Sequence, residues 1–131
     1  MTAYFPRFAS DPNYGMHLMR PLDYSCYAGA SVFDSTPSDL VRFGMAIHSG
    51  KLTRPAAVYG LGWTLNTVTI GGKRTQMIGQ DGDSLGGMVA SLMLLPEYGI
   101  VVGVTSNISY ADTAAIGQKI AAAFVKQWGA H

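Results

Sequence analysis

Apolar residues recur with a helical period in two segments of the chain. The first segment begins at Thr36-Pro37-Ser38-Asp39, where the threonine can cap a helix, the proline suits the first turn and the aspartate occupies the capping-box position. An apolar face follows at the spacing i, i+3, i+4 and i+7, and Gly50 is placed to end the helix. This face consists of Leu40, Phe43, Gly44 and Ile47, widened by Val41 and Met45. The pattern predicts a helix over residues 36–49.

The second helical pattern covers residues 112–128, near the C-terminal end of the chain. Asp112 or Ser109 can cap this helix. Its large apolar residues form a single stripe along the helix. The stripe consists of Ile116, Ile120, Ala123, Phe124 and Trp128.

Strand-like patterns fill the region between the two predicted helices. Residues 59–70 carry β-forming residues in rough alternation, and Gly71-Gly72 is a two-residue hairpin turn that leads into residues 73–78. Residues 88–95 and 100–106 are apolar on both faces, which is typical of strands that are covered on both sides. Residues 1–34 show no sustained period of either kind, so we expect them to be irregular.

These elements fit one α+β domain over residues 1–131. The order coil, helix, four strands, helix predicts an antiparallel sheet of three to four strands, with the C-terminal helix packed on it and the first helix nearby. A chain of 131 residues is long enough to bury a core of its own.

Composition and charge narrow the classes of function. Hydrophobic residues make up 48% of the chain and charged residues 13%, which argues against a disordered tail. The net charge of +1, without a basic run, argues against nucleic acid as a partner. The longest apolar run, residues 88–95, is too short to span a bilayer, and no signal-peptide pattern is present, so no membrane partner is predicted and the compartment stays open.

Cysteine and histidine usage predicts neither a metal site nor any other cofactor. The single cysteine, Cys26, excludes an internal disulfide, and we expect it to pack as a small hydrophobic residue. His17, His48 and His131 lack the spacing of metal ligands.

Ser84 lies in the string Gly-Asp-Ser-Leu-Gly, which two esterase families use around their nucleophile. In an α/β-hydrolase such a serine sits on a tight turn between a strand and a helix. Here the residues that follow, 88–95, have the pattern of a strand, and the only later histidine is His131. An esterase that uses Ser84 is therefore a minor alternative.

Five blocks of the chain, taken in order, carry a resemblance to known proteins. They are Tyr27 to Phe43, the Tyr-Gly-Leu-Gly-Trp string of residues 59–63, Gln80 to Gly86, the closing-strand segments Leu94 to Glu97 and Ile100 to Asn107, and the last helix. In the same order, these blocks resemble segments of the β-lactamase-related serine hydrolases, which include class C β-lactamases, D-Ala-D-Ala carboxypeptidases and related esterases. The resemblance covers about the last third of their domain and implies a partial β-lactamase/transpeptidase-like fold and the hydrolysis of an ester or amide.

The chain departs from this family in its catalytic motifs. The family nucleophile lies in Ser-x-x-Lys, and none of the lysines here has a serine three residues before it. None of the tyrosines is followed two residues later by Asn or Ser, so the Tyr-x-Asn (or Tyr-x-Ser) motif is lacking as well. No catalytic residue is therefore assigned within the chain.

The third active-site motif of the family, His or Lys followed by Thr or Ser and Gly, corresponds to Gln80-Asp81-Gly82. The resemblance implies a substrate-binding segment in which Gln80 donates a hydrogen bond, Asp81 would repel an anionic substrate, and the Asp83 N–H is one of two oxyanion donors. We expect Gly82 at the mouth of the strand that begins near Ile78, with that N–H facing solvent or a cleft. The candidate substrate-binding residues are Gln80, Asp81, Gly82, Asp83 and Ser84.

With this resemblance, the chain is predicted to contribute the side of a hydrolase site that carries the third active-site motif, and to be inactive alone. We call this side of the site the third-motif wall. Its expected partner is the missing N-terminal part of the hydrolase domain or a second copy of itself. The alternative from another class is a non-catalytic module that associates through its sheet. Residues 100–106 carry no lysine or proline that would protect an exposed edge, so a homodimer is predicted.

Overall fold

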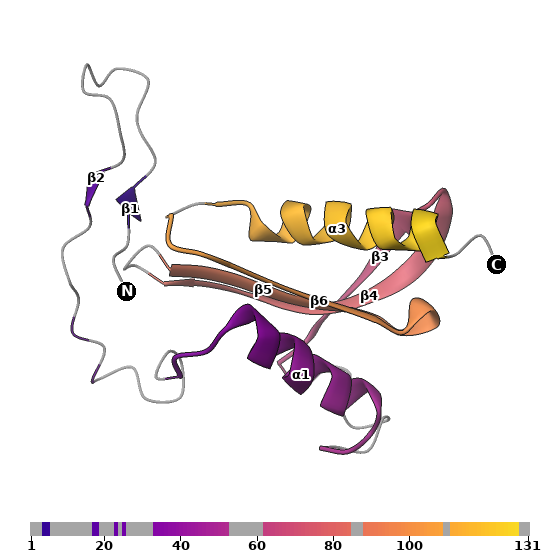
Figure 1. Cartoon of the computed structure of the whole chain (residues 1–131), viewed down its shortest axis with the longest axis horizontal. Helices are drawn as coiled ribbons and strands as arrows, with labels where there is room; N and C mark the ends of the chain where they lie inside the picture. Colours follow the sequence, from indigo (N-terminus) through magenta and orange to yellow (C-terminus); the bar gives the residue numbers. More distant parts are fainter. Residues whose placement is uncertain are drawn as a thin grey trace.

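The computed structural model describes residues 4–5, 17–18, 23, 25, 33–52, 62–84, 88–108 and 111–128. Its centre is a four-stranded sheet in the order β3-β4-β5-β6, in which every neighbouring pair is antiparallel. Two helices, α1 and α3, cover opposite faces of this sheet (Figure 1). The predicted α+β fold, with an antiparallel sheet and a C-terminal helix packed on it, is therefore confirmed. The strands are β3 (Thr64–Ile70), β4 (Lys73–Ser84), β5 (Met88–Leu95) and β6 (Ile100–Ser106), and the helices are α1 (Pro37–His48) and α3 (Thr113–Trp128).

The ends of both helices follow the capping signals in the sequence. Thr36 is the N-cap of α1 and accepts a hydrogen bond from the Asp39 N–H at 3.2 Å, while Gly50, with φ at 71°, takes up the left-handed backbone just after the helix. At α3, the Asp112 carboxylate accepts a hydrogen bond from the Ala115 N–H at 2.9 Å, so Asp112 acts as the cap. Ser109, the other predicted cap, lies outside the described residues.

Two tight turns set the register of the sheet. Gly71 and Gly72 both have positive φ, which lets two residues reverse the chain between Ile70 and Lys73 as predicted. The short 3₁₀ helix η1 (Pro96–Tyr98) and Gly99 connect β5 to β6, so that Leu95 pairs with Ile100.

Strand β4 is longer than the sequence pattern predicts. The alternation of apolar residues stops near Ile78, but the strand runs on to Ser84 because its second half pairs with β5, from Ile78↔Leu94 to Ser84↔Met88. The side chains of Gln80, Asp81 and Asp83 are exposed, so polar residues are tolerated at this end of the sheet. Residues 79–84, which lie beyond the predicted strand of residues 73–78, are therefore strand as well.

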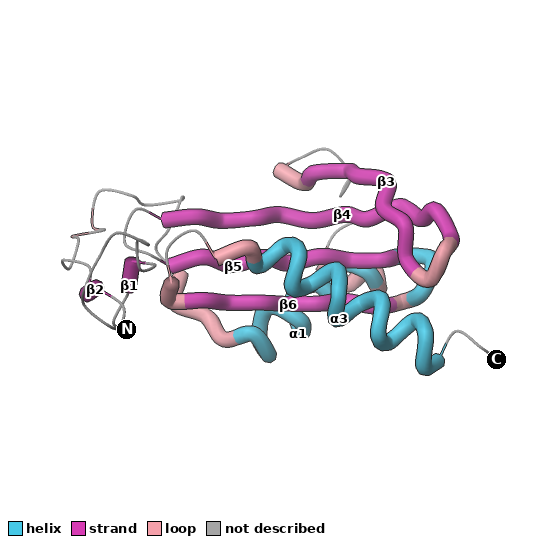
Figure 2. The backbone as a smooth tube through the Cα atoms, turned by 90° about the horizontal axis from the view of Figure 1, so that it is seen from above, coloured by secondary structure: helices cyan, strands magenta, loops and turns pink. Residues whose placement is uncertain are grey.

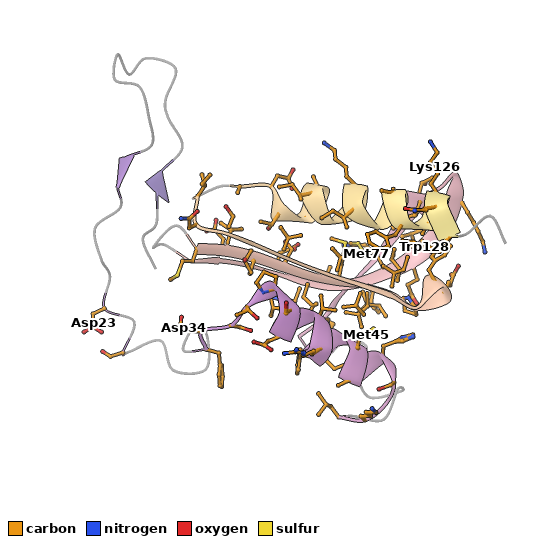
Figure 3. All side chains as sticks on the ribbon, in the orientation of Figure 1. Asp23, Asp34, Met45, Met77, Lys126 and Trp128 are labelled. Carbon is orange, nitrogen blue, oxygen red and sulfur yellow. The ribbon has the colours of Figure 1, made fainter. Side chains whose placement is uncertain are left out.

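The sheet separates two apolar cores. The core under α3 includes Met77, which Figure 3 shows between the sheet and that helix, together with Met93, Leu95 and Val102 of β5 and β6. The core over α1 is built from Ile47 of the helix and Ile78, Leu92 and Leu94 of the sheet. Burial of each of these side chains stabilises the fold by roughly 1.5–3 kcal/mol. The prediction that the apolar strands are covered on both sides is confirmed.

The apolar stripe of the C-terminal helix is not the face that packs on the sheet. Small residues of α3 such as Gly117 and Ala121 are buried against the sheet, whereas Ile116, Phe124 and Trp128 are exposed. The reason is volume, because Met93 occupies the space in front of Gly117, where an added Cβ would lie 2.5 Å from the Met93 Cε atom. The large core side chains come from the sheet, and the helix contributes the small ones.

Among the described positions of the first 34 residues, which were expected to be irregular, is a short antiparallel pair. Strands β1 (Tyr4–Phe5) and β2 (His17–Leu18) pair with each other over two residues each. Cys26 and residues 59–61 at the start of the predicted first strand lie outside the described residues.

Candidate substrate-binding site

An apolar pocket of about 350 Å³ lies between α1 and the strands β4 and β5. The sheet contributes Gln80 and Gly82 from β4 and their cross-strand partners Leu92 and Ala90 from β5. The remaining lining residues are Leu40 and Phe43 of α1 and Gly62 and Trp63, which precede β3.

Helix α1 forms its wall because the helix packs closely on the sheet. Gly103 of β6 has no side chain, and a Cβ there would lie 3.1 Å from the Pro37 carbonyl oxygen and 3.2 Å from the Leu40 Cβ. This close approach fixes the first turn of α1 over β6 and directs Leu40 toward the core, where it is half-buried. Phe43, one turn later, is 48% exposed and forms the outer part of the wall.

The hydrogen bonds at the start of α1 also stabilise the ionised form of Asp39, the residue before Leu40. Its carboxylate accepts a hydrogen bond from the Thr36 hydroxyl at 2.9 Å and another from Arg42 at 2.9 Å. These two bonds, that from Thr36 first, lower the pKa of Asp39 below its ordinary value of 3.8. The negative charge lies at the positive end of the helix dipole, which stabilises the first turn of the pocket wall.

Strand alternation divides the predicted substrate-binding segment between the two faces of the sheet. Gln80 and Gly82 share a face with Ile78 and line the pocket. Asp81 and Asp83 have the opposite parity and share the other face with Met77, so their carboxylates point away from the pocket. The structure thus places Gln80 and Gly82 in the lining of the pocket. It places the Asp81 carboxylate on the opposite face of the sheet, away from a ligand in the pocket.

Gln80 is the polar side chain of the pocket lining. Its amide nitrogen donates to the Asp81 carbonyl oxygen at 3.3 Å, a long hydrogen bond on an exposed side chain. Such a bond is easily exchanged for one to a ligand carbonyl or carboxylate, since the geometry is near the upper limit for a hydrogen bond.

Backbone groups beside Gly82 have no strand partner on one side among the described residues. Strand β3 pairs with β4 only from Thr64↔Gly79 onward, so among the described residues the segment 80–84 is paired with β5 alone. Backbone N–H groups alternate in direction along a strand, so every second one in this segment points to the unpaired side. Gly82 lies two residues before the end of a strand that begins at Lys73, not near Ile78 as expected.

Ser84 is the last residue of β4, and β5 begins at Met88. The connection therefore joins two antiparallel strands, Ser84 being paired with Met88. This differs from the strand-to-helix turn that presents the nucleophile of an α/β-hydrolase. The geometry gives no support to the esterase alternative.

Neither a metal-ligand cluster nor a membrane-spanning helix is found in the described part of the chain. Within it, His, Cys, Asp and Glu side chains form no group of three that could hold a metal ion. Likewise, neither α1 nor α3 is long and apolar enough to cross a membrane.

Sequence reasoning identified Gln80 and Gly82 but missed the apolar side of the pocket. The sequence pattern places Leu40 and Phe43 on a helix face, and it places Trp63, Ala90 and Leu92 in strands. The available signal was that Phe43 and Trp63 belong to two of the five blocks of the family resemblance, which meet here in space. Comparison with protein-family models, curated proteins and solved structures gives no match for this chain.

Proposed function

We propose that this chain forms the third-motif wall of an ester or amide hydrolase site of the β-lactamase-related kind. The observation that supports this is the convergence of three separate blocks of the resemblance on one pocket. Leu40 and Phe43 come from the first block, Trp63 from the second, and Gln80 and Gly82 from the third-motif block. In this role the chain binds substrate, and the nucleophile comes from elsewhere.

Each lining group has a part in this proposal. Apolar side chains of Phe43, Trp63 and Leu92 bury an aromatic or aliphatic group of the substrate. The Gln80 amide donates to a carbonyl or carboxylate oxygen, and Gly82 leaves room for the substrate to reach the strand backbone. The Asp83 N–H is the proposed oxyanion donor on that strand.

Ligand binding at the pocket can be measured with the two tryptophans of the chain. Trp63 lines the pocket and Trp128 lies on α3, across the sheet. We expect phenylacetylglycine, an arylacetyl amide with a terminal carboxylate, to change the emission of Trp63 in a Trp128→Phe variant. The emission of Trp128 in a Trp63→Phe variant should not change.

Gln80→Ala should weaken this binding by about five- to tenfold, the value of one hydrogen bond of roughly 1–1.5 kcal/mol. Gln76→Ala is the matched control, because Gln76 is exposed on the same strand and the same face but does not line the pocket. Equal effects of the two variants, or no binding at millimolar ligand, would contradict the proposed ligand site.

The catalytic part of the proposal has a separate test. We expect the motif Ser-x-x-Lys, together with Tyr-x-Asn or Tyr-x-Ser, in one of two places. It should be encoded in the DNA directly upstream of the Met1 codon, or it should occur in a chain that copurifies with this one. If neither source contains them, the hydrolase role is wrong even where the pocket binds the ligand.

A further inference from the structure

We propose that two copies of this chain associate through one flank of the molecule, which we call the β6–α3 flank. It consists of the outer edge of β6 and the exposed apolar stripe of α3 formed by Ile116, Ile120, Phe124 and Trp128. This surface is separate from the pocket between α1 and the sheet.

The stripe on α3 is unusually apolar for a helix surface. Its four large residues recur every fourth position, and their side chains are 38–57% exposed. Phe124 and Trp128 stack on each other, with ring centroids 4.8 Å apart. A row of aromatic and branched side chains of this kind typically marks an interaction surface.

The stripe lies beside β6. Phe124, Val125 and Trp128 line a hollow of about 270 Å³ together with Tyr98 and Ile100, the first residue of β6. Figure 2 shows α3 crossing from above β5 to the outer side of β6, so that its C-terminal half extends past the edge of the sheet. The apolar stripe and the strand edge therefore form one continuous surface.

The β6 edge has the properties of a strand that accepts another strand. Within the described residues β6 pairs only with β5, which leaves the backbone groups on its outer side without a strand partner. Its sequence, Ile-Val-Val-Gly-Val-Thr-Ser, contains no charge and no proline, the residues that normally protect an edge. The opposite edge, β3, is a more polar strand whose first four residues are exposed.

These features favour a second copy as the occupant. Unpaired N–H and C=O groups need a strand, which a lipid surface does not provide. Strand β6 is itself uncharged, so two copies can pair antiparallel about a two-fold axis without opposing like charges. Lys126 of α3 points away from the sheet (Figure 3), so its charge stays in solvent when the strands pair. The overhanging part of α3 then covers the partner's sheet and buries the stripe.

Sedimentation equilibrium of the whole chain at micromolar concentration tests the proposal. We expect a monomer–dimer equilibrium that is weakened by a charge on either part of the surface. Thr105→Lys places the charge on β6 and Phe124→Lys places it in the stripe, and each should raise the dimer dissociation constant by about tenfold or more, as for central interface residues. Both positions are partly exposed, so the variants should fold, which circular dichroism can verify.

Each variant has a matched control on another surface. Thr67→Lys makes the same change on the other edge strand, and Met45→Lys charges an exposed apolar residue of α1, and both should leave the dissociation constant within about twofold. A monomeric wild-type chain, or equal effects of Thr67→Lys and Thr105→Lys, would overturn the proposal. So would a monomer that cosediments with phosphatidylserine vesicles and loses this binding in Phe124→Lys, since the stripe would then be a membrane contact.

Discussion

Two buried threonines between the sheet and α3 differ in what their hydroxyl groups contact. The Thr113 hydroxyl is 2.6 Å from the Ser91 hydroxyl, whereas Thr75 Oγ1 has no hydrogen-bond partner among the described residues. A buried polar atom without a partner destabilises the fold by about 1–3 kcal/mol, so the isosteric Thr75→Val should be stabilising by about 1 kcal/mol. Thr113→Val should be destabilising by about 1–3 kcal/mol, because it leaves Ser91 unpaired. Urea unfolding of both variants checks the opposite signs, and a loss of stability in Thr75→Val would mean that its hydroxyl is satisfied.

Two helical glycines at the sheet should also respond differently to alanine. At Gly44 the new Cβ would lie 2.6 Å from Cγ1 of Val101, a side chain with little rotamer freedom, so we expect Gly44→Ala to be destabilising by about 1–2 kcal/mol. At Gly117 it would meet the flexible end of Met93, which can move, and the gain in helix propensity offsets the cost, so Gly117→Ala should stay within about 1 kcal/mol of wild type. Urea midpoints measured side by side test this ranking, which the reverse order would contradict.

Helix α1, as an element, depends on the exchange of hydrogen bonds between Thr36 and Asp39. Because the pKa of Asp39 is lowered in the folded chain, mainly by Thr36, the ionised Asp39 carboxylate contributes to the stability of the fold. This contribution is fully present above the ordinary pKa of 3.8 and is lost as the pH falls through the lowered pKa. Thr36→Ala should raise this pKa toward its ordinary value, which an NMR titration of the Asp39 carboxyl group detects. Loss of the cap should also be destabilising by about 1 kcal/mol in urea at neutral pH. Thr36→Ser keeps the hydroxyl and should retain both properties, so equal changes in the two variants would show that the cap does not act in this way.

At the scale of the whole molecule, the proposed division of roles predicts that the 131-residue chain is inert as a hydrolase. It carries the proposed ligand pocket but no Ser-x-x-Lys pair that would activate a nucleophile. We expect no turnover of a chromogenic β-lactam or of short-chain nitrophenyl esters, and no difference between wild type and Ser84→Ala. Turnover that disappears in Ser84→Ala would instead establish the esterase function.

The local sequence was sufficient to predict the elements and their class. Caps such as Thr36 and Asp112, and the Gly71-Gly72 turn, act through neighbours a few residues away, so they can be identified without knowledge of the fold. The apolar runs of β5 and β6 likewise predicted strands covered on both faces. For the candidate site, the family resemblance singled out Gln80 and Gly82, which line the pocket.

Only the tertiary structure decided the remaining features, because they depend on partners distant in sequence. The second half of β4 is a strand because β5 lies beside it, and the inner face of α3 is the small-residue face because Met93 of the sheet already fills the space. The pocket exists because α1 approaches Gly103 closely and so brings Phe43 opposite Gln80. Hydrophobic periodicity indicates which residues can be buried, but the volumes of the facing side chains determine which of them are.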